Sequence, residues 1–265
     1  MSNNILTIKT VQIAPVRVLM TALKDILLET NIYFTKSGIK IINMDKSHTI
    51  LVHLVLPASN FEYYEISTDK IIAGVNMFHL FKLINTIDND DTLTIYIEKE
   101  DYTDGIVHYL GLKFENNNIK QSKTQKLRLI EPDQEELSIP DIKFSSVLNM
   151  PSSDFQKIIR DLGAISDKLE IKSVGNELLF LCNGQFANAE IRRSECDNLQ
   201  FVEKKDNSYI IQGEFSLKNL NNFIKCTNLC NQIEMYLEND LPLIIKYNVA
   251  SLGSIRLCLS PLPKK

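Results

Sequence analysis

The sequence lacks a long hydrophobic run. Its longest apolar stretch, Thr49 to Leu56, is short and is interrupted by His53, whereas a membrane-spanning helix needs about 18 or more consecutive apolar residues. Residues Met1 to Asn4 include neither a basic region nor an apolar run, so we expect no secretory signal and no membrane partner. With 44% hydrophobic and 23% charged residues, the 265-residue chain has the composition of a soluble globular protein.

Cysteine and histidine are scarce, which argues against a disulfide framework or a metal centre. The five cysteines are an odd number, all in the second half of the chain and without regular spacing, and this favours reduced thiols inside a cell. Cys226 and Cys230 are one helical turn apart, but none of the four histidines lies near them to complete a metal site. We therefore expect no metal and no cofactor.

Side chains in catalytic arrangements are also lacking. Asp45 and His48 are close in sequence, but no plausible nucleophile accompanies them. A metal-dependent nuclease would need clustered carboxylates, whereas Asp25, Asp154 and Asp161 are scattered. The sequence therefore favours a binding protein over an enzyme.

Apolar residues recur with helical spacing in a few short segments, namely Pro15–Leu28, Met77–Asn85, residues 152–165 and residues 216–224. Most of the remaining chain is rich in β-branched residues and leucine, which predicts strands. The sequence thus predicts an α+β protein with few helices.

The order of these elements repeats within the chain. Arg17 aligns with Lys157 and Ile95 with Met235, so both ends of the repeat share one offset, 157 − 17 = 235 − 95 = 140. Such agreement predicts two tandem copies of one domain, each with two helices covering an antiparallel sheet. The polar stretch from Glu115 to Asp141 separates them. We place the first domain at residues 1–120, the connecting loop at 121–141 and the second domain at 142–265.

The polar faces of the predicted helices carry positive charge in both copies, although the net charge of the chain is −4. A solvated helix face is the ordinary alternative explanation. A basic face repeated in an acidic chain favours binding of double-stranded DNA through its phosphates, without reading of sequence. The candidate DNA-binding residues are Arg17, Lys24, Lys82, Lys157, Arg160, Lys218 and Lys225.

Six segments of the chain, in order, resemble the proliferating cell nuclear antigen family, the DNA sliding clamps of eukaryotes and archaea. They are "ALKDIL", "INMDKSHTILVHLVL", "GVNMFHLFKL", "LSIPD", "VLNMPSSDFQKIIRDLGAISD" and "DLPLIIKYNVASLGSIRLCLSP". The resemblance implies a homotrimeric ring that encircles duplex DNA as a polymerase processivity factor. It also implies that DNA polymerase, the clamp loader and other replication proteins dock on it through short peptides. A nucleus, or the replication site of a large DNA virus, is the implied location.

The resemblance further implies two sets of contact residues. The first forms a groove for partner peptides: Met44, His48, Thr49, Leu51, Leu127, Leu129, Ile130, Pro242, Cys258, Leu259, Ser260 and Pro261. The second set belongs to the strands Val107–Phe114 and Glu177–Leu181, which would pair between subunits, although from the sequence alone both strands are equally compatible with internal positions. Its residues are Val107, Tyr109, Leu110, Leu112, Glu177, Leu179 and Leu181.

Some residues depart from the family pattern. Cys258 stands where a tyrosine is usual in the groove, and Gly175 stands where many eukaryotic clamps have a lysine for ubiquitin-like attachment. Val18, Asn85 and Ala164 stand where many clamps have a basic residue or histidine, which weakens the expected hold on DNA. The alternative to a ring is a clamp-like processivity factor that grips DNA by charge as a monomer or dimer.

Overall fold

The computed structural model describes residues 3–132, 137–139, 142–206 and 209–263. The chain forms two compact units. The first unit contains Met1–Lys46, Val52–Ser138 and Val249–Ile255, and the second contains Ser47–Leu51, Ile139–Asn248 and Arg256–Lys265.

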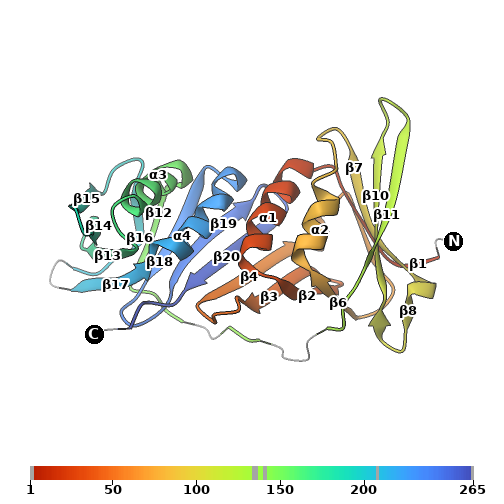
Figure 1. Ribbon diagram of the computed structural model, residues 1–265, viewed down its shortest axis with the longest axis horizontal. Coiled ribbons are helices and arrows are strands. Elements are labelled where there is room, and N and C mark those ends of the chain that lie inside the picture. The colour runs from red at the N-terminus through yellow and green to blue at the C-terminus, as the bar shows by residue number, and fades with distance from the viewer. Residues whose placement is uncertain (1–2, 133–136, 140–141, 207–208, 264–265) are drawn as a thin grey trace. The chain divides into compact units, whose positions relative to one another are not determined.

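Antiparallel sheet makes up most of the first unit (Figure 1). One sheet has the order β11-β10-β7-β1-β5, and another run of paired strands has the order β4-β3-β2-β6. The strands are β1 (Asn4–Thr10), β2 (Glu29–Thr35), β3 (Gly38–Met44), β4 (Ile50–Pro57), β5 (Tyr63–Ile66), β6 (Lys70–Asn76), β7 (Thr92–Glu98), β8 (Tyr102–Thr103), β9 (Ile106–Val107), β10 (Tyr109–Asn116) and β11 (Gln121–Arg128). Short 3₁₀ turns occupy η1 (Ala58–Asn60) and η2 (Lys99–Asp101).

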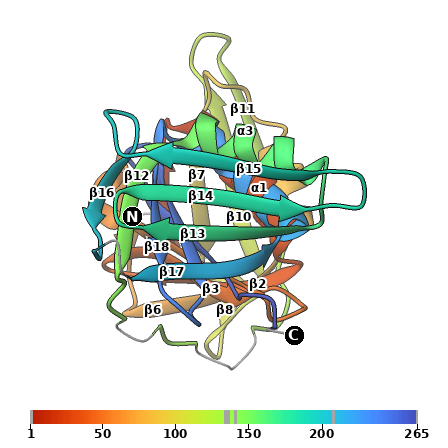
Figure 2. The same cartoon turned by 90° about the vertical axis from the view of Figure 1, so that its left-hand side faces the viewer.

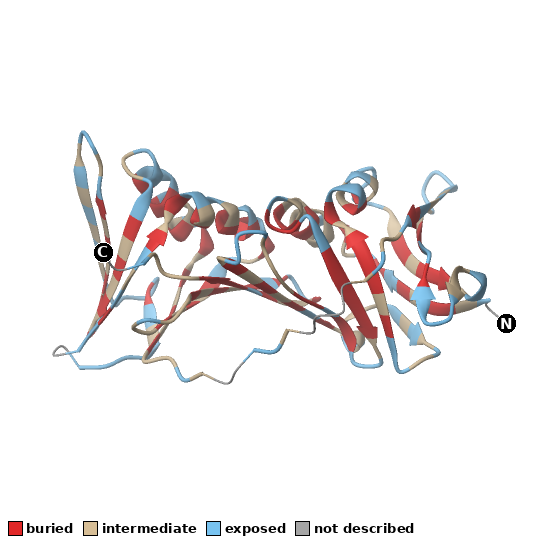
Figure 3. Ribbon diagram, turned by 60° about the horizontal axis from the view of Figure 1, so that its bottom comes forward, coloured by how far each residue is buried: buried red, intermediate tan, exposed pale blue. Residues whose placement is uncertain are grey.

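Helices α1 (Ile13–Ile26) and α2 (Met77–Ile84) pack against each other in this unit. Helix α1 buries an apolar stripe that includes Leu19 and Leu23, as the sequence spacing predicts. Helix α2 begins after Asn76, whose side chain accepts a hydrogen bond from the backbone N–H of His79, an N-cap that satisfies a first-turn amide. The buried residues of both helices face the strands (Figure 3), and the opposite side is exposed on α2 and mostly half-buried on α1.

The second unit repeats this plan. Its strands follow the orders β15-β14-β13-β17 and β16-β12-β18-β19-β20, and the first of these sheets faces the viewer in Figure 2. Helices α3 (Ser152–Gly163) and α4 (Leu217–Phe223) pack together, and α4 continues into the 3₁₀ helix η3 (Ile224–Leu229). The strands are β12 (Ser146–Pro151), β13 (Lys168–Val174), β14 (Glu177–Asn183), β15 (Asn188–Ser194), β16 (Gln200–Glu203), β17 (Ile210–Ser216), β18 (Gln232–Leu237), β19 (Leu243–Val249) and β20 (Gly253–Leu259).

The predicted internal repeat is confirmed by the matching positions of these elements. Helices α2 and α4 begin 217 − 77 = 140 residues apart, and strands β7 and β18 begin 232 − 92 = 140 residues apart. Strand order matches as well, because β5-β1-β7-β10-β11 in the first unit corresponds to β16-β12-β18-β19-β20. The α+β fold class with two tandem domains is therefore confirmed.

The boundary drawn before the connecting loop differs from the structure. Residues Gln121–Arg128, expected within the loop of 121–141, form strand β11 and pair along their length with β10. A turn at residues 117–120 joins the two strands, with the Asn116 side chain accepting from the Asn118 backbone N–H. The first domain therefore extends beyond residue 120. Residues 133–136 and 140–141 of the expected loop lie outside the described residues.

The strands expected at the subunit edges are internal. Strand β10, which holds Tyr109, Leu110 and Leu112, is hydrogen-bonded to β7 on one side and to β11 on the other. Strand β14, which holds Glu177, Leu179 and Leu181, lies between β13 and β15. Val107 is buried in the short β8–β9 hairpin. The expected pairing of these strands between subunits is therefore wrong, because their backbone groups are already used.

Candidate nucleic-acid interface and docking groove

Two of the predicted DNA-binding cations lie on α1, and both are partly engaged. The Arg17 guanidinium donates from Nη1 to Asn89 Oδ1 at 3.1 Å. The Lys24 ammonium lies 2.8 Å from Asp25 Oδ1, and it also sits 4.8 Å from the centre of the Phe81 ring. Because Asp25 offsets the charge of Lys24, this helix is less positive than its lysine and arginine content suggests.

Helix α2 contributes Lys82, which is exposed. Its Nζ lies 4.5 Å from the centre of the Phe78 ring, and Phe78 in turn stacks on Phe81 with ring centres 6.5 Å apart. The sequence reasoning identified the lysine but missed these rings. Their spacing in the sequence, with Phe78 four residues before Lys82 and three before Phe81, is the signal that would have found them.

The second unit has a matching group of cations on its helices. Lys157 and Arg160 on α3 and Lys218 on α4 are exposed, and Lys225 in η3 donates to Asn222 Oδ1 at 3.1 Å. Asp154, at the start of α3, pairs with Arg193 at 3.0 Å. This ion pair offsets the nearby negative charge, so the exposed face of α3 is more positive than the sequence of the helix alone indicates.

Three of the predicted groove residues of the first unit, Leu127, Leu129 and Ile130, lie where the chain leaves β11, and Met44 ends β3. Leu129 donates its backbone N–H to His108 O, and Ile130 donates to Gly74 O of β6, both at 2.9 Å. The side chains of Leu129 and Ile130 are half-buried, as is Met44, whereas Leu127 is buried. These backbone bonds fasten the start of the connecting loop to the sheet and keep two apolar side chains partly accessible.

The predicted groove residues of the second unit are brought together by one backbone contact. Ser260 donates its N–H to Thr49 O at 2.9 Å, which places the end of β20 against the loop that contains His48. His48 is exposed and has a left-handed backbone, with φ of 54°. The half-buried residues of this group are Thr49, Leu51, Pro242, Ser260 and Pro261.

Two further predicted groove residues, besides Leu127, have buried side chains. Leu259 is only 1% exposed and belongs to the core, so its side chain does not line a surface groove. Cys258 is 9% exposed, and burial raises the pKa of its thiol to about 11. The thiol therefore stays neutral at physiological pH and contributes a small apolar surface.

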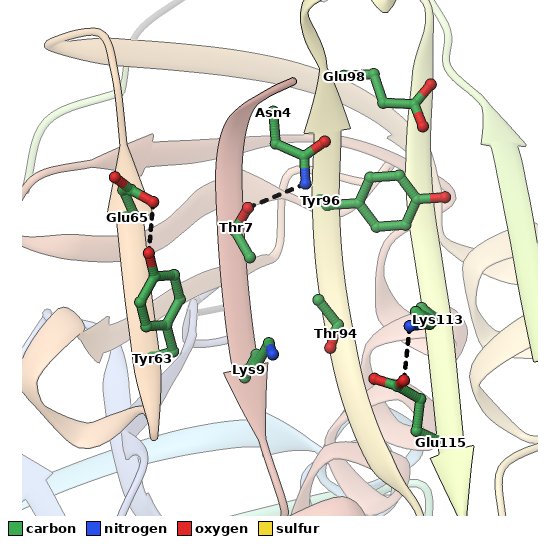
Figure 4. A pocket seen from close by; sticks show the side chains of 10 residues that line it. All are labelled: Asn4, Thr7, Lys9, Tyr63, Glu65, Thr94, Tyr96, Glu98, Lys113 and Glu115. Atoms are coloured by element: carbon green, nitrogen blue, oxygen red, sulfur yellow. Dashed lines mark hydrogen bonds and ion pairs between the residues drawn. The ribbon is translucent and has the colours of Figure 1, made fainter. Parts of the chain in front are cut away.

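A hollow of about 420 Å³ lies on the face of the five-stranded sheet, over β5, β1, β7 and β10 (Figure 4). The Tyr63 hydroxyl donates to Glu65, and Lys113 pairs with Glu115 at 2.6 Å. Tyr96 lies flat over Gly111, since a Cβ at that glycine would be 2.3 Å from the ring. The lining groups thus largely satisfy one another, although the buried Thr94 hydroxyl has no hydrogen-bond partner.

Neither a metal site nor a membrane helix is found in the described part of the chain. No group of three or more His, Cys, Asp or Glu side chains there is arranged to hold an ion. Cys226 is fully buried, and burial raises the pKa of its thiol to about 12, far from the deprotonated state a metal requires. No described helix is long and apolar enough to cross a membrane.

Two family models together match almost the whole chain. Residues 5–136 match the proliferating cell nuclear antigen N-terminal domain, and residues 138–262 match the C-terminal domain of the same protein. The chain belongs to the proliferating cell nuclear antigen family. The resemblance inferred from the sequence is therefore confirmed, and the boundary between the two matches falls beyond strand β11.

Similar proteins of this family come from viruses and from a fungus. The chain is 31% identical over 264 residues to the probable DNA polymerase sliding clamp 1 of Paramecium bursaria Chlorella virus 1, covering 98% of both chains. It is 33% identical over 247 residues to the proliferating cell nuclear antigen of Chaetomium thermophilum, covering 91% of both. A probable DNA polymerase sliding clamp of Acanthamoeba polyphaga mimivirus is 35% identical over 225 residues, and the match spans 47% of that longer relative.

Proposed function

We propose that this protein is a sliding clamp that encircles duplex DNA as a homotrimer and tethers DNA polymerase to its template. The observation that carries the proposal is that the helices of both domains carry cations in a chain whose net charge is −4, with Lys82 exposed in the first domain and four exposed cations in the second. Exposed cations attract phosphates only loosely, and loose contacts allow sliding. A closed ring prevents escape and raises the effective concentration of the tethered enzyme near its primer end.

The open strand edges support assembly into a ring. On β6, Gly74 accepts a hydrogen bond from Ile130 of the connecting loop, and on β17, Glu214 accepts one from Leu262 at 2.7 Å. These chain segments partly cover β6, the end strand of the order β4-β3-β2-β6, and β17, the end strand of the order β15-β14-β13-β17. Strands β11 and β15 also end their sheet orders, and no such cover of them is found among the described residues; the same holds for β5 and β16. An exposed edge is a template for pairing with another chain.

Apolar residues beside two of these edges also support the pairing of β11 with β15 of a neighbouring subunit. Ile119, two residues before β11, is 64% exposed, and Phe186, two residues before β15, is 77% exposed. In the proposed pairing a neighbouring subunit would cover these two side chains. This pairing replaces the pairing of β10 with β14 that the sequence suggested.

We also propose that partner proteins dock on the clamp, which the accessible residues in each unit support. Met44, Leu129 and Ile130 offer apolar surface in the first unit, and His48 and Ser260 offer polar and backbone groups in the second. Short peptides from DNA polymerase, the clamp loader and other replication proteins, with an aromatic and an aliphatic side chain, fit such a surface. The protein would act in a nucleus or at the replication site of a large DNA virus.

The proposal is tested by the mass of the protein in solution, measured by light scattering over a concentration series. A mass of three times 30.3 kDa that persists on dilution is expected for the ring. Thr124 and Gln125 in β11 are then each replaced by proline. Successive backbone amides point to opposite sides of a strand, so one of the two prolines leaves the β10 pairing intact and blocks the open edge.

The variant that keeps its secondary structure by circular dichroism should be monomeric. A trimer that survives both substitutions would place the subunit contact elsewhere than β11. A wild-type protein that stays monomeric or dimeric at all concentrations would overturn the ring and favour direct gripping of DNA by charge.

A further inference from the structure

Aromatic and cationic side chains of α2 and of the neighbouring α1 form a cluster, here called the Phe78 patch, made of Phe78, Phe81 and Lys82 from α2 and Lys24 from α1. Phe78 is 44% exposed. Its ring is 6.5 Å from the ring of Phe81 at an interplanar angle of 24°, a stacked arrangement. Lys82 lies over Phe78 at 4.5 Å and Lys24 lies over Phe81 at 4.8 Å. The rings and the ammonium groups are thus held together on the surface.

The patch is not needed for the core of the domain. Helix α2 already buries Met77, Leu80 and Ile84 against the sheet, and these three residues form the apolar stripe expected of a surface helix. Phe78 lies outside that stripe. Its ring is partly exposed, and a ligand would reach the ring face by displacing the exposed Lys82 side chain that lies over it.

The internal repeat gives a direct comparison for this position. With the offset of 140 residues, Phe78 corresponds to Lys218 and Phe81 corresponds to Asn221 on α4. Both of these residues are polar and exposed. The second domain therefore presents a purely polar helix face at the same place, so the aromatic rings are a specialisation of the first domain.

The chemistry of the patch matches an unpaired nucleobase with its phosphate. Aromatic rings stack on the faces of bases, and neighbouring cations hold the backbone, which is how single strands are bound without regard to sequence. A duplex hides its base faces, so simple phosphate attraction would not need the rings. We propose that the Phe78 patch binds single-stranded DNA, with a base stacked on Phe78 and the adjacent phosphate held by Lys82.

The inference rests on the proposed function in one respect, since α2 must face DNA within the clamp. It predicts that the clamp holds the unpaired template strand next to a primer end. Stacking would add a position-dependent contact to the otherwise loose hold of the ring. A base anchored in this way would slow sliding where duplex meets single-stranded template. Sliding on continuous duplex would be unchanged.

The test uses the full-length protein and an oligothymidine that contains one 2-aminopurine, whose fluorescence falls when the base stacks. The variants are Phe78→Leu, which keeps apolar bulk but removes the aromatic face, and Phe78→Lys, which copies the second domain. Tyr63→Leu is the matched control, because Tyr63 on β5 is exposed to a similar extent, 45% against 44% for Phe78, and does not lie on a helix. Wild-type protein and the control should quench the fluorescence, and each Phe78 variant should bind about ten-fold more weakly with little quenching.

Two results would overturn the inference. The first is equal quenching and affinity in wild type and both Phe78 variants. The second is a change in the mass of the Phe78 variants without a change in oligonucleotide binding, which would make Phe78 a subunit contact. Retention on closed circular duplex is measured in parallel. Loss of quenching in the Phe78 variants, with retention on duplex equal to that of wild type, supports the patch. Quenching by a wild-type protein that is not retained on duplex supports the patch and refutes the clamp.

Discussion

Replacing Gly74 by alanine should detach the start of the connecting loop from the sheet. Gly74 lies in β6 and forms an isolated bridge with Ile130, whose backbone N–H donates to Gly74 O at 2.9 Å. A Cβ added at Gly74 would lie 2.4 Å from Ile130 O and 3.1 Å from Glu131 O. Glycine is therefore required here by the close approach of a second backbone.

The expected loss of peptide affinity in Gly74→Ala follows from these distances. An ordinary contact of a Cβ begins at 3.4 Å, so Ile130 must move by 3.4 − 2.4 = 1.0 Å. A shift of this size breaks the hydrogen bond to Gly74, which is worth about 1 kcal/mol. If partner peptides require Ile130 in its attached position, they must restore it on binding. Since about 1.4 kcal/mol corresponds to a factor of ten, we expect peptide affinity to fall by roughly five- to ten-fold.

Two measurements check this reasoning. Hydrogen exchange should show faster exchange of the Ile130 amide in Gly74→Ala, and fluorescence anisotropy should show weaker binding of a polymerase-tail peptide. Gly163→Ala is the matched control, because its Cβ would meet only Asn221 Nδ2 at an ordinary 3.6 Å. Unchanged exchange and affinity would refute the predicted clash. Faster exchange with unchanged affinity would remove Ile130 from the docking surface.

Two further predictions concern charge and thiol chemistry. Lys157→Glu combined with Lys218→Glu should shorten retention on circular duplex DNA and leave the thermal unfolding midpoint nearly unchanged, because exposed charges contribute little to stability; retention equal to that of the control Lys99→Glu would contradict the DNA-facing assignment. Cys258, whose pKa is raised to about 11 by burial, should be alkylated at pH 8 far more slowly than the exposed Cys196. Because unfolding restores its usual pKa, the neutral thiol supports folding fully below about pH 8.5, and this contribution is lost as the pH rises toward 11. Equal alkylation rates at pH 8 would show that Cys258 is accessible.

Much of the fold could be predicted from periodicity. The apolar spacing in α1 and α2 and the shared offset between the domains are properties of the sequence that packing preserves. Strand β11 was missed because its sequence, QSKTQKLR, is polar and only Leu127 in it is buried. Its strand conformation comes from pairing with β10, and such long-range pairing leaves little local signal.

The candidate site was predictable only in part, for a related reason. The helix cations could be found from their spacing, but the ion pair of Lys24 with Asp25 and the contacts of lysines with Phe78 and Phe81 depend on side-chain geometry. Likewise, the alignment of a residue with a family motif does not determine how exposed its side chain is. Leu259 matched the groove in register, yet it points into the core.

Pairing of β11 with β15, as proposed, would give the assembly of this protein a polarity. Strand β11 belongs to the first unit and β15 to the second, so an interface between them joins unlike surfaces and is heterologous. Every added subunit then presents the same free edge again. Such an interface yields a finite closed object only when its rotation returns to the starting subunit, and otherwise it grows into a filament. A substitution that alters this rotation would therefore produce fibres, without weakening any contact at the interface itself.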